Sequence, residues 1–495
     1  MRQPSEERRP STAKMAGAVT ITGQLVKMII QFVGLIAFSR LLSPRDVGLI
    51  AMLGVFLMLG EMVRDFGLSQ AAIQTPKLTH GQASNLFWIA LLIGALLTSG
   101  LVLAAPAIAT MYREPVLRTI APWIALCLVI NALQTQFQVR LARDFRFAAL
   151  TVTDAASQLI GLVAGLTAAL AGAGYWSLVI QMLVVSISLL IQRVSVAGWL
   201  PGCPRREPGM LPLYQFGIHS GLAQLLGYAA SNTDSYIIGI RWGANALGVY
   251  NRAFSMSTLP ASQILAPLGN VALTLLSRRR HDGGDFYPML WKAQVVLSVV
   301  LTFVFALVAA LAEPFVFLAL GPAWAESATL LSILSVGGAF QVLSNVAFWA
   351  FSASGNARQL FLSGLVTRPL IVALVVVGSM GGLGGIAWGF SAGLVVSWFI
   401  SLAWLRRCDG MPVLGFLYSG LHVTLSGLIA GGMGWLFVNQ LYPRISTLSL
   451  VAAGFLLVTS IYFLLLLLSS RERKFLLEIS KPILNRVRSR FCADV

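Results

Sequence analysis

The sequence has few of the residues that soluble enzymes use for chemistry. Of its 495 residues only 18 are acidic, four are His and four are Cys, and charged residues make up 11% of the chain. His80, His219, His281 and His422 are scattered along the chain, and the cysteines have neither the pattern of a disulfide framework nor metal-ligand spacing. We therefore expect no metal site and no cofactor.

Sequence motifs of catalysis are also missing. There is no Gly-rich phosphate loop with its Lys, no nucleophile elbow and no paired His and Glu of a zinc site. The segments between apolar runs are too short to hold a soluble active site. We expect a protein that is not an enzyme, whose energy comes from an ion gradient or from the gradient of its own substrate.

Long apolar segments dominate the chain instead. Hydrophobic residues make up 57% of it and the mean hydropathy is +0.80. A spanning helix needs about 20 apolar residues, and the chain contains about fourteen such stretches without the period-2 alternation of a barrel. The predicted ranges are 16–39, 46–70, 84–109, 116–138, 149–171, 174–196, 216–240, 246–275, 290–312, 325–352, 358–379, 382–405, 414–436 and 447–469. The sequence predicts an all-α polytopic membrane protein.

Positive charge is distributed unevenly between the predicted loops. With both termini on one side, most Lys and Arg residues fall on that side, including Arg278, Arg279 and Arg280 and those after Ser470. Cytoplasmic loops carry such an excess, so both termini are predicted to be cytoplasmic, and the basic tail to lie along anionic lipid. The net charge of +17 thus indicates topology, and nucleic acid is not expected as a partner because no soluble domain carries a basic face.

Two segments suggest an internal repeat. Arg40 to Ile50 and Ile240 to Tyr250 both form a short turn that ends on an aliphatic residue and Gly as the next helix begins. Chance recurrence of Gly and Pro turns is the alternative explanation. A true repeat gives two pseudo-symmetric lobes of six helices followed by two further helices. The predicted parts are an N-terminal cytoplasmic segment 1–15, an N-lobe 16–196, a cytoplasmic linker 197–215, a C-lobe 216–405, the last two helices within 414–469 and a basic tail 470–495.

Polar residues inside the predicted helices indicate a wet interior. Gln24, Lys27 and Gln31 share one helical face, since they are three and four residues apart. A charge at mid-bilayer costs about 2.5–3.5 kcal/mol, so such residues must face protein or water. Arg252 and Arg368 have no acidic residue within a helical turn. Their partner is then either distant in sequence or a ligand.

A cationic cavity for an anionic substrate follows from these residues. Guanidinium groups suit phosphate because their planar fork can donate two parallel hydrogen bonds. The predicted cavity residues are Gln24, Lys27, Gln31, Arg64, Arg252 and Arg368. Asp65, Asp154 and Asp234 are candidate ion-coupling carboxylates, and each is equally a candidate counter-ion for an Arg. For Arg64 the alternative is that Glu61 or Asp65 neutralises it. For any single Gln or Asn residue the alternative is a hydrogen bond to a neighbouring helix.

At these residues the chain resembles a known family. The segments Phe38 to Met52, Asp65 to Gln74, Asn232 to Gly239 and Leu247 to Ala253 closely resemble polysaccharide-export flippases of the colanic acid exporter type. Shorter matches are Leu141 to Phe147, Gly172 to Leu178 and Gly321 to Trp324. The resemblance covers about residues 16 to 405 and is weaker over the last two helices.

The resemblance implies membership of the multidrug/oligosaccharidyl-lipid/polysaccharide exporter superfamily, whose two lobes alternate between inward and outward openings. The implied substrate is an undecaprenyl-pyrophosphate-linked oligosaccharide, translocated across the bacterial inner membrane for exopolysaccharide, capsule or lipopolysaccharide. Membrane lipids and the polysaccharide polymerase and chain-length machinery are the implied partners, and Arg252 is implied to line the cavity. Ser235 stands where many relatives have a polar amide or acid, which leaves a coupling role for Asp234 open.

Two other functions compete with this one. A cation-coupled drug or metabolite antiporter of the same superfamily would need a smaller, less cationic cavity with one dominant carboxylate. A membrane enzyme such as a glycan polymerase or ligase would need a large outer loop with catalytic Arg or His. The scattered Arg residues and the short loops disfavour both.

Overall fold

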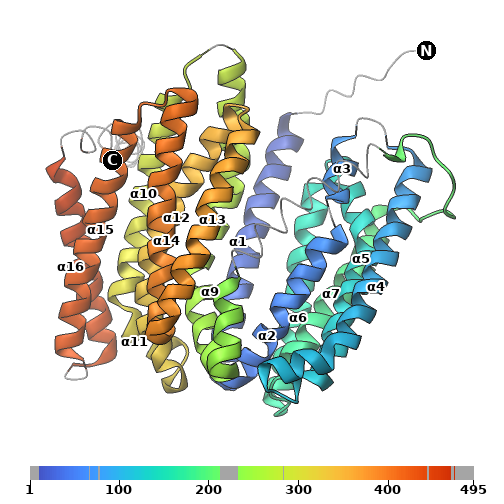
Figure 1. Cartoon of the computed structure of the whole chain (residues 1–495), viewed down its shortest axis with the longest axis horizontal. Helices are drawn as coiled ribbons and strands as arrows, with labels where there is room; N and C mark the ends of the chain where they lie inside the picture. Colours follow the sequence, from blue (N-terminus) through green and yellow to red (C-terminus); the bar gives the residue numbers. More distant parts are fainter. Residues whose placement is uncertain are drawn as a thin grey trace, which may run out of the picture. The chain divides into compact units, whose positions relative to one another are not determined.

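The computed structural model describes residues 10–65, 67–75, 78–211, 232–282, 284–442, 445–469 and 473. Within these ranges the chain forms α-helices and two short 3₁₀ turns, without strands (Figure 1). It divides into two compact units, with the boundary between Arg252 and Ala253. This part of the chain is thus all-α, as the sequence predicts.

The described residues of the first unit form seven complete helices and the start of an eighth. Their bounds are α1 Pro10–Leu41, α2 Pro44–Asp65, α3 Leu68–Gln74, α4 His80–Tyr112, α5 Leu117–Arg143, α6 Phe147–Leu170, α7 Trp176–Ala197 and α9 Thr233–His281. Helix α4 packs along α5, α6 along α7, and α1 along α6. Close packing uses small residues, since Gly165 of α6 lies against the Ser177 carbonyl of α7.

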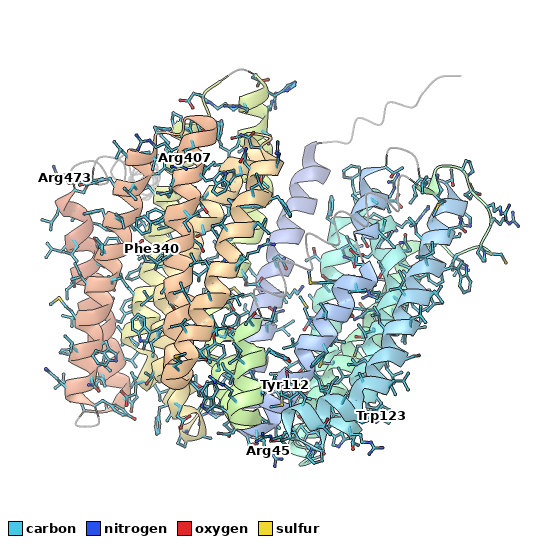
Figure 2. All side chains as sticks on the ribbon, viewed as in Figure 1. Arg45, Tyr112, Trp123, Phe340, Arg407 and Arg473 are labelled. Carbon is cyan, nitrogen blue, oxygen red and sulfur yellow. The ribbon has the colours of Figure 1, made fainter. Side chains whose placement is uncertain are left out.

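The part of the second unit that the structure describes contains the rest of α9 and seven further helices. Their bounds are α10 Tyr287–Ala310, α11 Ala312–Ala319, α12 Ala325–Ala353, α13 Ala357–Gly378, α14 Gly382–Asp409, α15 Val413–Leu441 and α16 Thr447–Leu468. Helix α14 packs against α12 and α13, and α10 against α12 and α15. Phe340, Trp398 and Phe416 belong to one apolar core cluster, and Figure 2 shows Phe340 among the helices of this unit.

Eleven helical segments among the described residues are long and apolar enough to cross a membrane. One of them, Arg358–Arg407, contains both α13 and α14. Helix α9 is not among the eleven, because polar and basic residues such as Asn251 and Arg252 interrupt it. Most of the predicted range 216–240 and nearly all of the tail 470–495 lie outside the described residues. A polytopic membrane protein is confirmed, and the number of fourteen spans stays a prediction.

The two segments that echo each other in sequence lie against each other in the first unit. A Cβ atom on Gly48 would overlap the carbonyl oxygen of Ala244, and one on Gly248 would overlap the carbonyl oxygen of Pro44. These contacts are reciprocal, since each Gly meets the residue four positions before its counterpart. We call Pro44–Gly48 and Ala244–Gly248 together the glycine junction. It places the start of α9 with the first unit, whereas the lobe boundaries at 196 and 216 stay a prediction.

Local hydrogen bonds shape both sides of the glycine junction. Ser43 and Asp46 cap the start of α2 reciprocally, because the Asp46 carboxylate accepts from the Ser43 amide at 3.0 Å and the Ser43 hydroxyl accepts from the Asp46 amide at 3.2 Å. Helix α9 bends at Gly243, which has a φ of 79°. Figure 2 shows Arg45, which forms an ion pair with Glu114, at the same end of this unit as Tyr112.

Substitution of either junction glycine is expected to destabilise the protein. Gly48→Ala or Gly248→Ala places a methyl group against backbone, which cannot move aside as a side chain can, at a cost of about 1–3 kcal/mol. Thermal unfolding of the purified protein in detergent measures the loss. Gly54→Ala, also in α2 but with no atom within 4 Å of the new Cβ, is the matched control and should unfold like wild type. Equal melting temperatures for all three variants would contradict the close packing.

Candidate functional site

Charged and amide side chains from five helices of the first unit form one continuous chain of contacts. It begins where α2 faces α5. The Arg64 guanidinium pairs with Glu61 at 2.7 Å and donates to the Asn131 carbonyl at 3.1 Å and to the Thr135 hydroxyl. The Asn131 amide donates to the other Glu61 oxygen at 2.6 Å. Arg64 is therefore neutralised within its own turn, which is the alternative that the sequence left open.

Helix α5 carries the contacts onward to α7. Asn131, Gln134 and Gln138 are spaced three and four residues apart, so they share one face of α5. Gln134 donates to the Asn131 side-chain oxygen at 3.3 Å. Arg193 of α7 donates to the side-chain oxygens of Gln134 and Gln138, at 2.9 Å to the latter. These amides therefore bond neighbouring helices, as expected for polar residues between membrane helices.

The chain ends at a carboxylate that two cations share. Asp154 of α6 accepts a hydrogen bond from Arg193 at 2.7 Å, and its other oxygen lies 3.7 Å from the Lys27 ammonium of α1. Only 5% of the Arg193 side chain is exposed, against 26% for Lys27 and 31% for Asp154. Arg193 is thus the buried, closely bonded partner, and Lys27 is the looser and more accessible one.

These contacts leave an excess of positive charge. The connected contacts include three cations, Lys27, Arg64 and Arg193, and two carboxylates, Glu61 and Asp154. The helix segments that carry them are among those able to cross a membrane. Since unpaired charge is costly there, the cluster is suited to accept one further anion, and Lys27 is the cation with the most room to bind it. We call Lys27, Asp154 and Arg193 the shared-carboxylate triad.

The other predicted site residues lie elsewhere in the described chain. Gln24 and Gln31 are half-buried on the same helix as Lys27. Asp65 accepts a hydrogen bond from Ser69. Arg252 is 9% exposed in the first unit, whereas Arg368 is an exposed residue of α13 in the second. The structure therefore brings Lys27, Arg64 and Asp154 into one chain of contacts, and their function as a substrate site stays a prediction.

Asp234 has partners that tie together the two arms of the α9 bend. It is 3% exposed and accepts hydrogen bonds from the Tyr250 hydroxyl and from the Ser235 amide, each at 2.7 Å. Asp234 and Tyr250 lie on opposite sides of the bend at Gly243. These bonds give Asp234 a structural function at the glycine junction, in addition to the coupling role considered from the sequence.

Arg193 is the residue that sequence reasoning missed. Its position close before the predicted linker 197–215 suggests a helix end on the cytoplasmic side. The signal that could have identified it is the isolated Asp154, which has no basic residue within a turn and therefore needs a cation from another helix.

Arg193 and Lys27 should differ in their effect on stability. Arg193→Gln leaves a half-buried carboxylate and two amides without their closest partner, and removing one partner of a buried pair costs about 3–5 kcal/mol. Lys27→Gln breaks a longer, more exposed pair and should cost at most about 1 kcal/mol. Thermal unfolding in detergent compares them, with Arg140→Gln as the control because Arg140 forms a half-exposed ion pair with Asp144 at 3.7 Å. Equal losses for Arg193→Gln and Lys27→Gln would contradict this ranking.

Solved structures of low sequence identity share this fold. The lipid II flippase MurJ in its inward closed conformation superposes with a TM-score of 0.74 at 11% identity, covering 92% of this chain and 99% of that one. An inward-facing multidrug resistance MATE family transporter of the MOP superfamily gives a TM-score of 0.61 at 13% identity, covering 81% and 99%. The fold is thus that of the MOP-superfamily transporters.

Several similar proteins are named for polysaccharide biosynthesis. Teichuronic acid biosynthesis protein TuaB of Bacillus subtilis (strain 168) is 25% identical over 86% of this chain and 90% of its own length. Succinoglycan biosynthesis transport protein ExoT of Rhizobium meliloti (strain 1021) is 22% identical over 90% of each chain. Lipopolysaccharide biosynthesis protein WzxC of Escherichia coli (strain K12) is 20% identical over 85% of this chain and 84% of its own.

The resemblance inferred from the sequence motifs is therefore confirmed. Residues 37–329, more than half of the chain, match the family described as "Polysaccharide biosynthesis protein". Together with the eleven candidate spans and the MOP-superfamily fold, this match shows that the chain is a multi-pass membrane protein that belongs to the polysaccharide biosynthesis protein family.

Proposed function

We propose that this protein is a flippase that translocates undecaprenyl-pyrophosphate-linked oligosaccharide repeat units across the bacterial inner membrane. The glycan then serves exopolysaccharide, capsule or lipopolysaccharide assembly. The names of TuaB, ExoT and WzxC support a role in polysaccharide biosynthesis, and the fold shared with a lipid II flippase supports translocation of a lipid-linked substrate. The observation that carries the proposal is the cluster of the first unit with one cation in excess.

The shared-carboxylate triad suggests how an anion would be held. Charge-assisted hydrogen bonds are usually about 2.7–2.9 Å long, so Lys27, at 3.7 Å from Asp154, is not closely held. A pyrophosphate oxygen would take Lys27 as its partner, while Arg193 keeps Asp154 neutralised at 2.7 Å. Binding of the pyrophosphate then leaves no carboxylate of the triad unpaired inside the membrane. The lipid tail would stay in the bilayer throughout.

Asp154 is the best placed of the three candidate coupling carboxylates. It lies next to the cation proposed to bind substrate, whereas Asp234 is tied to Tyr250 and Asp65 accepts from Ser69. An ion or proton that binds Asp154 would weaken its hold on Lys27 and so change the affinity for pyrophosphate. Such a reciprocal coupling is what an exporter driven by an ion gradient needs.

The antiporter alternative has less support. A cationic drug needs a carboxylate that is free to pair with it, and the two carboxylates of the charged cluster, Glu61 and Asp154, already pair with Arg64, Arg193 and Lys27. The charge distribution of Lys and Arg supports cytoplasmic termini. A polysaccharide polymerase with its chain-length machinery would then be the partner that consumes the translocated units.

Loss of a substrate-binding cation is expected to stop export while the protein still inserts. Lys27→Ala, and separately Arg252→Ala, should lower surface polysaccharide at least tenfold when the variant gene replaces the wild type in the source bacterium, because pyrophosphate loses a charged partner. Lipid-linked repeat units should accumulate in the same cells, as measured in extracted lipid. Immunoblotting of membranes checks insertion.

Lys292→Ala serves as the control, since Lys292 is an exposed residue of α10 in the second unit. It should support normal export. Normal surface polysaccharide in a Lys27→Ala strain would remove Lys27 from the substrate site.

A further inference from the structure

The second unit contains a cavity whose lining, unlike the connected contacts of the first unit, has no charged side chain among the described residues. Helices α9, α12 and α14 surround a space of about 470 Å³, within the range of about 300–1,000 Å³ common for small-molecule sites. Thr258, Ala261, Leu265 and Gly269 line it from one face of α9, as their helical spacing allows. We call this space the α9–α12–α14 pocket.

The lining of the pocket is largely apolar, with several polar groups and, among the described residues, no charged one. Among the described residues that line it there is no acidic or basic side chain. Its polar groups are hydroxyls and amides, among them Ser262, Gln341 and Asn345. A phosphate would find no cation here and a cationic drug no carboxylate. The occupant that matches this lining is electrically neutral.

Helix α12 presents hydrogen-bonding groups to that occupant. Gln341 and Asn345 are one turn apart, and the Asn345 amide nitrogen donates to the Gln341 backbone carbonyl at 2.9 Å, which leaves the Asn345 side-chain oxygen as an acceptor. The half-buried Gln341 side chain forms no hydrogen bond within the described part of the chain. An amide offers two donor hydrogens and an acceptor oxygen, which suits a ligand with several hydroxyl groups. A hydrocarbon chain in the same place would leave these groups unsatisfied.

Aromatic rings line the same space. Phe348, Trp349 and Phe390 lie around it, and 44% of Phe348 is exposed although it belongs to a helix that is otherwise largely buried. Phe390 is held edge-to-face by Phe254 at 5.5 Å between ring centroids. Aromatic faces carry partial negative charge and attract the polarised C–H groups of a sugar ring. Amides beside aromatic faces are thus a combination that fits a carbohydrate.

We infer that the α9–α12–α14 pocket binds a sugar ring of the substrate, with Gln341 and Asn345 bonded to its hydroxyls and Phe348 stacked on its apolar face. This inference rests on the proposed flippase function and assigns a neutral sugar of the glycan to the second unit, whereas the cations proposed to bind pyrophosphate belong to the first. Glycan selectivity then resides in α12 side chains, and Lys27 serves any pyrophosphate-linked substrate.

The test measures binding of the two halves of the substrate separately. The full-length protein in lipid nanodiscs is titrated calorimetrically with two probes. One is the oligosaccharide repeat released by hydrolysis from the surface polysaccharide of the source strain, and the other is undecaprenyl pyrophosphate without glycan. Gln341→Leu and Phe348→Ala should each weaken oligosaccharide binding about tenfold and leave undecaprenyl pyrophosphate binding unchanged. Lys27→Ala should weaken undecaprenyl pyrophosphate binding and leave oligosaccharide binding unchanged.

Phe317→Ala is the matched control, because Phe317 is also 44% exposed but lies on α11, outside the pocket lining. Melting temperatures show whether each variant is folded, and two independent variants guard against the loss of one. Unchanged oligosaccharide affinity in both Gln341→Leu and Phe348→Ala overturns the sugar site. A wild type that binds undecaprenyl pyrophosphate but no oligosaccharide overturns it too, while the flippase proposal stands. A wild type that binds neither probe overturns both.

Discussion

The hydrogen-bonded ion pair between Arg193 and Asp154 determines how the first unit holds charge among its membrane-spanning helices. It is 2.7 Å long and joins α7 to α6, and the two amides of α5 that Arg193 also contacts extend the interaction to the Arg64–Glu61 pair of α2. Because Arg193 neutralises Asp154 by itself, Lys27 has freedom to bind something else. Paired charges of this kind are costly to break, so the cluster fixes the helices while leaving one cation available.

Backbone contact gives the glycine junction a different kind of rigidity. Gly48 and Gly248 admit the carbonyl groups of Ala244 and Pro44 where any side chain would collide. A hydrogen bond from Tyr250 to Asp234 joins the two arms of the α9 bend. A fixed junction at one end of the first unit and a charged cluster built from α1, α2, α5, α6 and α7 give this unit two separate points of constraint. The uncharged pocket of the second unit has neither feature among its described residues. This difference agrees with the proposal that the second unit binds the glycan and the first unit binds pyrophosphate.

Much of this arrangement can be predicted from single helices, and the remainder depends on contacts between helices. The positions of Gln24, Lys27 and Gln31 on one face follow from helical spacing, as does the Arg64–Glu61 pair, three residues apart. Arg193 bonds residues 39 to 59 positions away, which no local spacing reveals. Asp234 meets Tyr250 only because the chain bends at Gly243. The number of membrane spans is harder still to predict, since polar and basic residues such as Asn251 and Arg252 lower the hydropathy of α9.

Translocation itself is tested most directly by where the glycan stays when the protein is missing. The gene is deleted in the source bacterium, and lipid-linked repeat units are quantified together with their access to a glycan-modifying reagent applied from the periplasmic side. A flippase predicts that complete lipid-linked repeats accumulate, that they are protected from the reagent, and that surface polysaccharide disappears. Complete repeats that react with the reagent, or unchanged surface polysaccharide without accumulation, would contradict it.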